Sequence, residues 1–226
     1  MRGKAGITRR EFLRYGGSGA AGALLSPWRL PSAGAQAASL EGAGLSLPCC
    51  VGDVGADGAL VWLRTERASS VVVEYANNAG FQGAARTAPL ATRSESDFTA
   101  KIVIGGLEPG THYFYRAVVA ERQPGPAARF VTAPRADTPA SFRFAFSGDT
   151  RQSYQPFSIM DAIRENKPDF FMHLGDTIYG DRKGAARTLA QYHGKYLANR
   201  KDEPSQRLFA ETSLSVVWDD HEVADN

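Results

Sequence analysis

The sequence predicts an all-β part followed by an α/β part that is built on a parallel sheet. Two observations carry this prediction. Short β-prone segments separated by turn residues fill residues 59–132, whereas strands alternate with amphipathic segments after residue 141. The 226 residues, of which 43% are hydrophobic and 22% charged, have the composition of a globular protein. A disordered, collagen-like or multi-pass membrane protein is therefore excluded.

The first 35 residues have the pattern of an export leader. A basic start precedes an uncharged run over Gly16–Leu25, and small residues at Ala33–Ala35 are typical of a cleavage site. Thr8–Arg14 resembles the signal of the twin-arginine pathway. We expect a signal peptide over residues 1–35, the twin-arginine translocase as a partner, and a periplasmic or secreted protein. The apolar run is too short to span a bilayer, so we expect no stable membrane anchor.

Basic residues gather in this leader. The chain holds 26 Lys and Arg against 24 Asp and Glu, but beyond residue 35 the acidic residues outnumber the basic ones. We therefore expect no nucleic-acid-binding surface.

A β-sandwich is expected over residues 40–133, because short β-prone runs recur there without helical periodicity. The expected strands are Ala59–Leu63, Val71–Tyr75, Phe98–Ile104, Tyr113–Val119 and Arg129–Thr132. The turn at Leu107–Tyr113 resembles the tyrosine corner of fibronectin type III domains, in which Tyr113 would bond back to the chain.

The two cysteines, Cys49 and Cys50, exclude a scaffold built on disulfides. Neighbouring residues do not easily reach disulfide geometry, and two thiols alone make a poor zinc site. We interpret both as structural residues; a redox or metal role is the alternative.

Polar residues and prolines over 134–140 indicate a linker, and strands and helices alternate over residues 141–226. The expected order is strand Phe142–Phe146, helix Pro156–Asn166, strand Phe170–Leu174, helix Ala185–Arg200 and strand Leu214–Trp218. This order predicts a parallel sheet with right-handed crossovers.

Each of these three strands ends in acidic residues, at Ser147–Asp149, Gly175–Tyr179 and Asp219–Glu222. The carboxyl ends of parallel strands meet at one edge of the sheet, where ligands bind in open α/β folds. Any single aspartate could instead serve a turn or a helix cap. Several converging carboxylates repel one another unless a hard metal ion lies between them. The joint pattern therefore indicates a metal site.

The segments Gly148–Asp149, Gly175–Tyr179 and Asp220–Glu222 resemble the first three motifs of the calcineurin-like metallophosphoesterases. The tyrosine three residues after the second aspartate narrows the resemblance to the purple-acid-phosphatase type and to PhoD-like alkaline phosphatases. His173–Tyr179 and Trp218–Val223 are specifically similar to the PhoD family. The resemblance implies that the α/β part is an incomplete four-layer metallophosphoesterase sandwich.

The resemblance also implies two metal ions, Fe³⁺ plus Ca²⁺. Asp176 would bridge them, and Asp149 would bind the first, at a position where PhoD-like proteins often have cysteine. Tyr179 would bind the same ion as tyrosinate, which favours ferric iron. Asp220, at a position where the superfamily usually has asparagine, would bind the second ion.

Further roles follow from the same resemblance. His221 would contact the phosphate and protonate the leaving oxygen. Arg151 lies where many relatives have a histidine ligand and would help to bind phosphate. Asp219 is an alternative metal ligand. His173 is interpreted as a core residue with its hydrogen bonds satisfied rather than as a ligand, and His193 receives no role.

The superfamily also has two later histidine motifs that complete the metal sites. The sequence holds four histidines, and none follows His221. We therefore expect residues 141–226 to be the N-terminal part of a metallophosphoesterase domain.

Together these expectations predict an exported, metal-dependent phosphoric ester hydrolase of the alkaline phosphatase D type, with a phosphate ester as its substrate. Two metal ions would activate water for attack on phosphorus. The sequence does not separate monoesters from diesters. The alternative is an exported β-sandwich binding protein that carries an inactive remnant of the enzyme domain.

Overall fold

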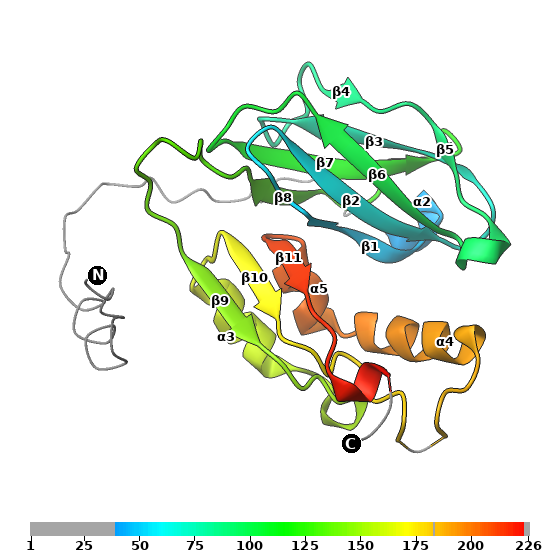
Figure 1. Ribbon diagram of the computed structural model, residues 1–226. Coiled ribbons are helices and arrows are strands. Elements are labelled where there is room, and N and C mark those ends of the chain that lie inside the picture. The colour runs from blue at the N-terminus through cyan, green and yellow to red at the C-terminus, as the bar shows by residue number, and fades with distance from the viewer. Residues whose placement is uncertain (1–38, 183, 224–226) are drawn as a thin grey trace, which may run out of the picture. The chain divides into compact units, whose positions relative to one another are not determined.

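The computed structural model describes residues 39–182 and 184–223 (Figure 1). The leader expected over residues 1–35 lies outside the described residues. Among the helices that are described, none combines the length and the apolar character needed to cross a membrane.

The β part consists of two antiparallel sheets (Figure 1). The first sheet has the order β1-β2-β6, formed by Leu45–Gly52, Gly58–Thr65 and Thr99–Gly105. The second has the order β4-β3-β7-β8, formed by Ala85–Arg86, Ser70–Ala76, His112–Val119 and Ala128–Val131, with β5 (Leu90–Ala91) also paired to β3. A short helix, α2 (Leu40–Ala43), precedes β1, and a 3₁₀ turn, η1 (Ser94–Ser96), precedes β6.

The core of the β part lies between the two sheets. Along β1 and β2 every second residue is buried, as expected when one face of a strand packs on a core and the other does not. Tyr115 and Phe130 fill the centre with their rings edge to face, 5.8 Å apart. The expected corner is present, because the hydroxyl of Tyr113 accepts a hydrogen bond from the backbone N–H of Glu108 at 3.0 Å.

Strand β1 was not expected from the sequence. Pro48 lies within it, and proline removes a ladder hydrogen bond. The structure accommodates this residue because β1 is an edge strand whose pairing with β2 shifts register on both sides of Leu47. Cys49 consequently becomes a core residue, 3% exposed, and both cysteines are free.

The α/β part contains a parallel sheet of the order β9-β10-β11, formed by Phe144–Ser147, Phe170–His173 and Ser213–Val216. Between the strands lie η2 (Gln152–Tyr154), α3 (Ser158–Glu165), α4 (Leu189–Arg200) and α5 (Glu203–Phe209). Because the strands follow one another in sequence order, right-handed crossovers place their helices on one face of the sheet. A buried cluster fills that face: Phe157, Met160, Phe171, Leu208, Phe209 and Leu214.

Several elements of this part differ from expectation. The first strand begins at Phe144 rather than Phe142. Helix α4 begins at Leu189, because Thr188 forms a capping box with Gln191. Helix α5 was missed, although its cap, in which Asp202 accepts from the N–H of Ser205 at 3.0 Å, is a recognisable start.

The opposite face of the parallel sheet carries exposed aromatic rings. Phe142 and Phe146 are each 62% exposed, and Phe144 stacks on Phe170 with ring centroids 5.3 Å apart. One face of this sheet is therefore packed and the other is open.

Among the described residues, the β part contacts the α/β part, and the two form one compact unit. A side chain at Gly52 of β1 would meet the backbone oxygen of Leu214 in β11 at 2.7 Å, so the two backbones touch there. Arg129 of β8 pairs with Glu211, which follows α5, at 2.8 Å.

Phe171→Ala should lower the free energy of unfolding by about 3–5 kcal/mol, because the ring is fully buried and stacks on Phe209. Phe144→Ala, on the open face of the same sheet, is the matched control and should cost less than about 1 kcal/mol. Urea unfolding followed by circular dichroism measures both. Equal losses would contradict a core on one face alone.

Candidate metal centre

The three loops that follow the parallel strands are joined through their backbones. The N–H of Asp149 donates to the carbonyl of Gly175 at 3.2 Å, and that of Thr150 donates to the carbonyl of Asp176 at 3.0 Å. The N–H of Val217 donates to the carbonyl of His173 at 3.1 Å. The carboxyl ends of β9, β10 and β11 therefore form one continuous rim.

Asp149 and Asp176 both leave their strands in the left-handed region, with φ of 59° and 53°. Few residues adopt this conformation, and aspartate is one of those that tolerate it. Gly175, just before Asp176, has φ of 101°, and a Cβ there would lie 2.5 Å from the Cβ of Asp219. Glycine is therefore required at this position by both conformation and space.

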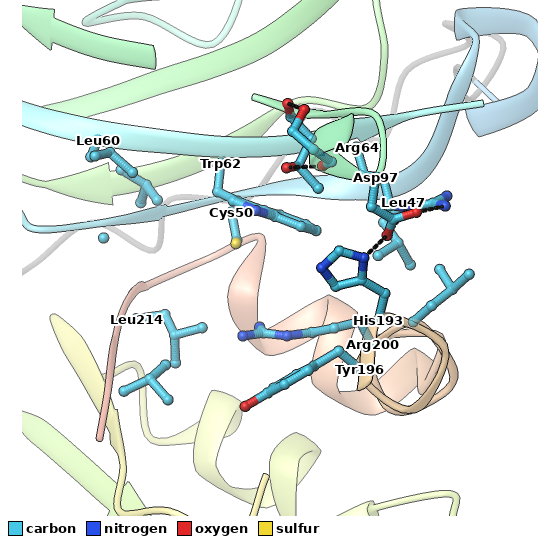
Figure 2. A pocket seen from close by; sticks show the side chains of 16 residues that line it. Leu47, Cys50, Leu60, Trp62, Arg64, Asp97, His193, Tyr196, Arg200 and Leu214 are labelled. Carbon is cyan, nitrogen blue, oxygen red and sulfur yellow. Dashed lines mark hydrogen bonds and ion pairs between the residues drawn. The ribbon is translucent and has the colours of Figure 1, made fainter. Parts of the chain in front are cut away.

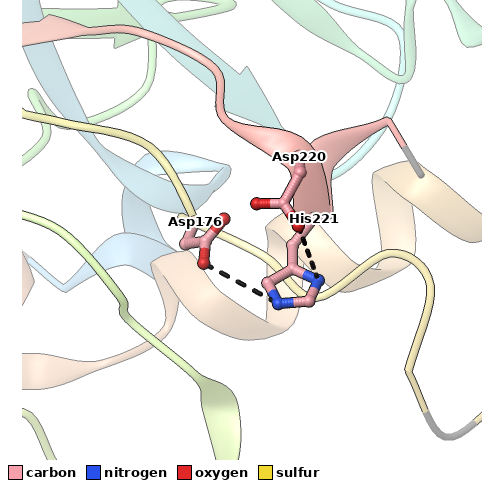
Figure 3. A group of neighbouring side chains, drawn as sticks. All are labelled: Asp176, Asp220 and His221. Atoms are coloured by element: carbon pink, nitrogen blue, oxygen red, sulfur yellow. Dashed lines mark ion pairs between the residues drawn. The ribbon is translucent and has the colours of Figure 1, made fainter. Parts of the chain in front are cut away.

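Asp176, Asp220 and His221 come together at this rim (Figure 3). One ligand atom from each lies within 4.8 Å of the others, a spacing that suits one metal ion. The buried Oδ1 of Asp176 has no hydrogen-bond partner. Burial, together with the nearby carboxylates of Asp149 and Asp220, raises the pKa of Asp176 against the opposing effects of His221 and of a hydrogen bond from Tyr179. An unpartnered carboxylate oxygen among like charges fits a cation site.

Asp149 and Tyr179 lie beside this group. The hydroxyl of Tyr179 donates to Oδ1 of Asp149 at 2.9 Å, and its ring lies 4.1 Å from that of His221. Burial, then the hydrogen bond to Asp149, raises the pKa of the Tyr179 phenol. The chain's own groups thus hold this tyrosine neutral, and only a cation would favour its anionic form.

His221 has a partner that the sequence analysis missed. Its Nδ1 lies 2.8 Å from a carboxylate oxygen of Asp181, while Nε2 faces Asp176 at 3.9 Å. Burial lowers the pKa of His221, but the hydrogen bond to Asp181 and the surrounding carboxylates outweigh it, so the net shift is upward. The only signal for Asp181 in the sequence is its place five residues after Asp176.

The loop that carries Tyr179 and Asp181 is held from two sides. Lys195 of α4 donates from Nζ to the carbonyls of Tyr179 and Arg182, at 2.8 and 3.0 Å. The N–H of Gly180 donates to the carbonyl of His221 at 2.8 Å. This loop is therefore fixed against both α4 and the loop after β11.

Arg151 and Asp219 lie outside the three-residue group. Arg151 is exposed, and its guanidinium lies 5.6 Å from the ring centre of Tyr179. Asp219 instead caps η3 (Asp220–Glu222), where its side chain accepts from the N–H of Asp220 at 3.0 Å.

Comparison with known proteins covers both parts of the chain. The family model of the PhoD-like phosphatase N-terminal domain matches residues 32–134, and the model of the PhoD-like phosphatase domain matches residues 143–226. The chain belongs to the PhoD-like phosphatases.

Individual relatives agree with this family. The chain is 25% identical to alkaline phosphatase D of Bacillus subtilis (strain 168), over 96% of this chain and 42% of the relative. The solved structure of PhoD superposes with a TM-score of 0.76 at 22% identity, covering 83% of this chain and 41% of PhoD. The purple acid phosphatase PPD1 of yellow lupin (Lupinus luteus) gives a TM-score of 0.52 at 10% identity, over 77% of this chain and 35% of its own.

These likenesses show a metallophosphoesterase-like fold with β sheets. They also show that this PhoD-like chain spans about two fifths of the length of the relatives it matches.

A cavity of about 380 Å³ lies apart from the acidic rim of this PhoD-like chain, where α4 faces β1 and β2 (Figure 2). Trp62, Tyr196 and Leu214 are among its mainly apolar lining residues, and Cys50 borders it. None of Asp176, Asp220 and His221 lines this cavity.

His173 lies beneath the rim as a buried, hydrogen-bonded residue, 3% exposed. The hydroxyl of Thr150 donates to the carbonyl of Thr177 at 3.1 Å, which leaves its oxygen to accept from Nε2 of His173 at 2.9 Å. Nδ1 is then free to accept from the hydroxyl of Thr177 at 3.2 Å. A neutral imidazole therefore satisfies the whole network and joins the first two loops from below.

Burial, with the nearby charge of Arg200, lowers the pKa of His173 to about 4. An unfolded chain binds this proton near pH 6.5, so between pH 6.5 and 4 the unfolded state holds more protons than the folded one. The free energy of unfolding should therefore fall as the pH drops through this window, by up to about 3 kcal/mol from this residue.

His173→Gln should remove this contribution and flatten the dependence of stability on pH between 6.5 and 4. The exposed His112→Gln is the control and should leave the slope unchanged. Urea titrations at several pH values measure the slope. The same slope in His173→Gln as in the native chain would show that this histidine titrates normally.

Proposed function

We propose that this chain is the N-terminal part of an exported, metal-dependent phosphoric ester hydrolase. The convergence of the carboxylates of Asp176 and Asp220 beside His221, all within 4.8 Å and around an unpartnered carboxylate oxygen, supports a metal centre that the two carboxylates would hold and that His221 would face. Membership of the PhoD-like phosphatases supports a phosphate ester as the substrate. Export through the twin-arginine translocase to the periplasm or outside the cell rests on the pattern of residues 1–35.

In this proposal Asp149 and Tyr179 would hold the first ion, Asp220 would hold the second, and Asp176 would contribute to both. All four offer oxygen atoms, the donors that hard cations such as Fe³⁺ and Ca²⁺ prefer. The phenolate of Tyr179 favours the ferric ion. When bound, the ions supply the positive charge that activates the attacking water and stabilises the transition state at phosphorus.

His221 acts as the general acid. Its Nε2 points into the rim toward Asp176, and Asp181 holds Nδ1 from behind. A hydrogen bond at Nδ1 fixes which nitrogen can release a proton, so the proton on Nε2 goes to the leaving oxygen of the ester. Arg151, exposed beside Tyr179, binds the phosphate oxygens through its planar guanidinium.

Asp176→Asn should abolish metal binding, because an amide bridges two cations far less well than a carboxylate does. Tyr179→Phe keeps the ring and removes the phenolic oxygen, so iron retention and a visible charge-transfer band should be lost. The measurements use the full-length protein, native and variant. Elemental analysis gives the metal content, absorption spectra give the colour, and hydrolysis of an aryl phosphate monoester and of a diester gives the activity. A metal-free native protein, or full metal and colour in both variants, would refute the metal centre.

His221→Asn should keep the metal and lower kcat by roughly 10²–10⁴-fold, as expected for the loss of a general acid. Asp181→Asn should lower kcat by roughly 10-fold or more with the metal content unchanged, since Asp181 orients His221 through the contact at Nδ1. Asp137→Asn, exposed in the segment between the two parts, is the control. An Asp181→Asn variant with native kcat would show that its contact with His221 has no part in turnover.

A further inference from the structure

Glu222 is a buried carboxylate without a basic partner. Glu222 is 7% exposed, and no ion pair joins it to Lys, Arg or His in the part of the chain that the structure describes. Such a charge needs hydrogen-bond donors in place of water. The donors here are all backbone N–H groups.

Each oxygen of Glu222 accepts two of these bonds. Oε2 accepts from Asp176 at 3.0 Å and from Asp219 at 2.9 Å. Oε1 accepts from Ile178 at 3.2 Å and from Thr177 in a shorter bond. Hydrogen bonds to an ionised acceptor are stronger than those between neutral groups.

These bonds do more than cap a helix. The bond from Asp219 belongs to the capping box of η3 and stays within the loop after β11. The other three come from consecutive residues of the loop after β10, whose amides form a concave set that suits an anion. One carboxylate thus joins the two loops that carry Asp176 and His221.

We propose that Glu222 is a positioning residue that sets the spacing between Asp176 and the pair Asp220–His221, and so sets the metal affinity of the centre. This inference rests on the proposed metal-dependent function. The amide of Asp176 itself is one of the bonded donors, so the bond fixes the backbone from which the bridging carboxylate projects. Glu222 acts behind the site, through backbone, and contributes no ligand atom to the group formed by Asp176, Asp220 and His221.

Glu222→Gln tests the proposal with little change of shape. Each carboxylate oxygen of Glu222 accepts from two N–H groups. In the glutamine variant the NH₂ group replaces one of these oxygens, and a donor cannot accept from two donors. Two hydrogen bonds are therefore lost in either orientation of the amide. Glu222→Asp keeps the charge but draws the oxygens back by one methylene. Glu165→Gln, an exposed residue near the end of α3, is the matched control.

The experiment uses the full-length protein, native and variant, from which bound metal has been removed. Calorimetric titration with Mn²⁺ measures metal affinity, hydrogen exchange measures protection of the amides of residues 176–178, and thermal melting checks the fold. For Glu222→Gln we expect a Kd for Mn²⁺ that is roughly 10- to 100-fold weaker, with faster exchange at these amides. Glu165→Gln should match the native protein in all three measurements.

Native Mn²⁺ affinity in folded Glu222→Gln would overturn the proposal and leave the metal centre standing. A native protein that binds no Mn²⁺ would remove the metal centre and this proposal with it. If Glu222→Gln does not fold, Glu222→Asp takes its place with the same expectation. Loss of the fold in both variants would overturn the proposal, because Glu222 would then serve stability alone.

Discussion

The loops after β10 and β11 lie against each other at Gly175 and Asp219, and the geometry of the acidic rim depends on that contact. Backbone approaches backbone so closely that even one methyl group on Gly175 would overlap Asp219. The amides of the first loop can then share the carboxylate of Glu222 with the second. Asp176 and His221, distant in sequence, meet because two chain segments touch without side chains between them.

The rim concentrates charge that the chain alone does not neutralise. Burial and like charges raise the pKa of Asp176, and burial together with the hydrogen bond to Asp149 raises the pKa of Tyr179. Both shifts disfavour the anionic form, which is the form that binds a metal. The fold therefore disfavours the anionic forms of Asp176 and Tyr179 electrostatically, and a bound cation would favour them again. A neutral His173 beneath them supports the loops without adding another charge.

Local pattern was enough to predict the strands of the parallel sheet and the acidic residues at their ends. Phe170–His173 is a strand because its β-prone residues alternate between two faces, and parallel strands bring their carboxyl ends to one edge. Strand β1 was missed, because Pro48 fits there only through the irregular pairing with β2.

The partners of Asp181 and Glu222 could not be predicted from local pattern. Their hydrogen bonds join segments 40 or more residues apart, and such bonds depend on how closely two loops approach in the folded chain. The local sequence pattern therefore predicted the candidate ligands, but it could not predict the residues that orient them. The leader expected over residues 1–35 lies in residues that the structure does not describe.

The position of the two adjacent cysteines in β1 also determines how reactive their thiols are. Burial, and then the neighbouring thiol, raises the pKa of Cys49 to about 12, and burial raises that of Cys50 as well. A thiol that stays protonated at neutral pH is a poor nucleophile toward oxidants and disulfides, since the thiolate is the reactive form. Strand geometry also directs the two side chains to opposite faces of the sheet, one into the core and the other toward the cavity beside α4. Both thiols are therefore slow to react with oxidants and disulfides, and they serve β1 as packing groups.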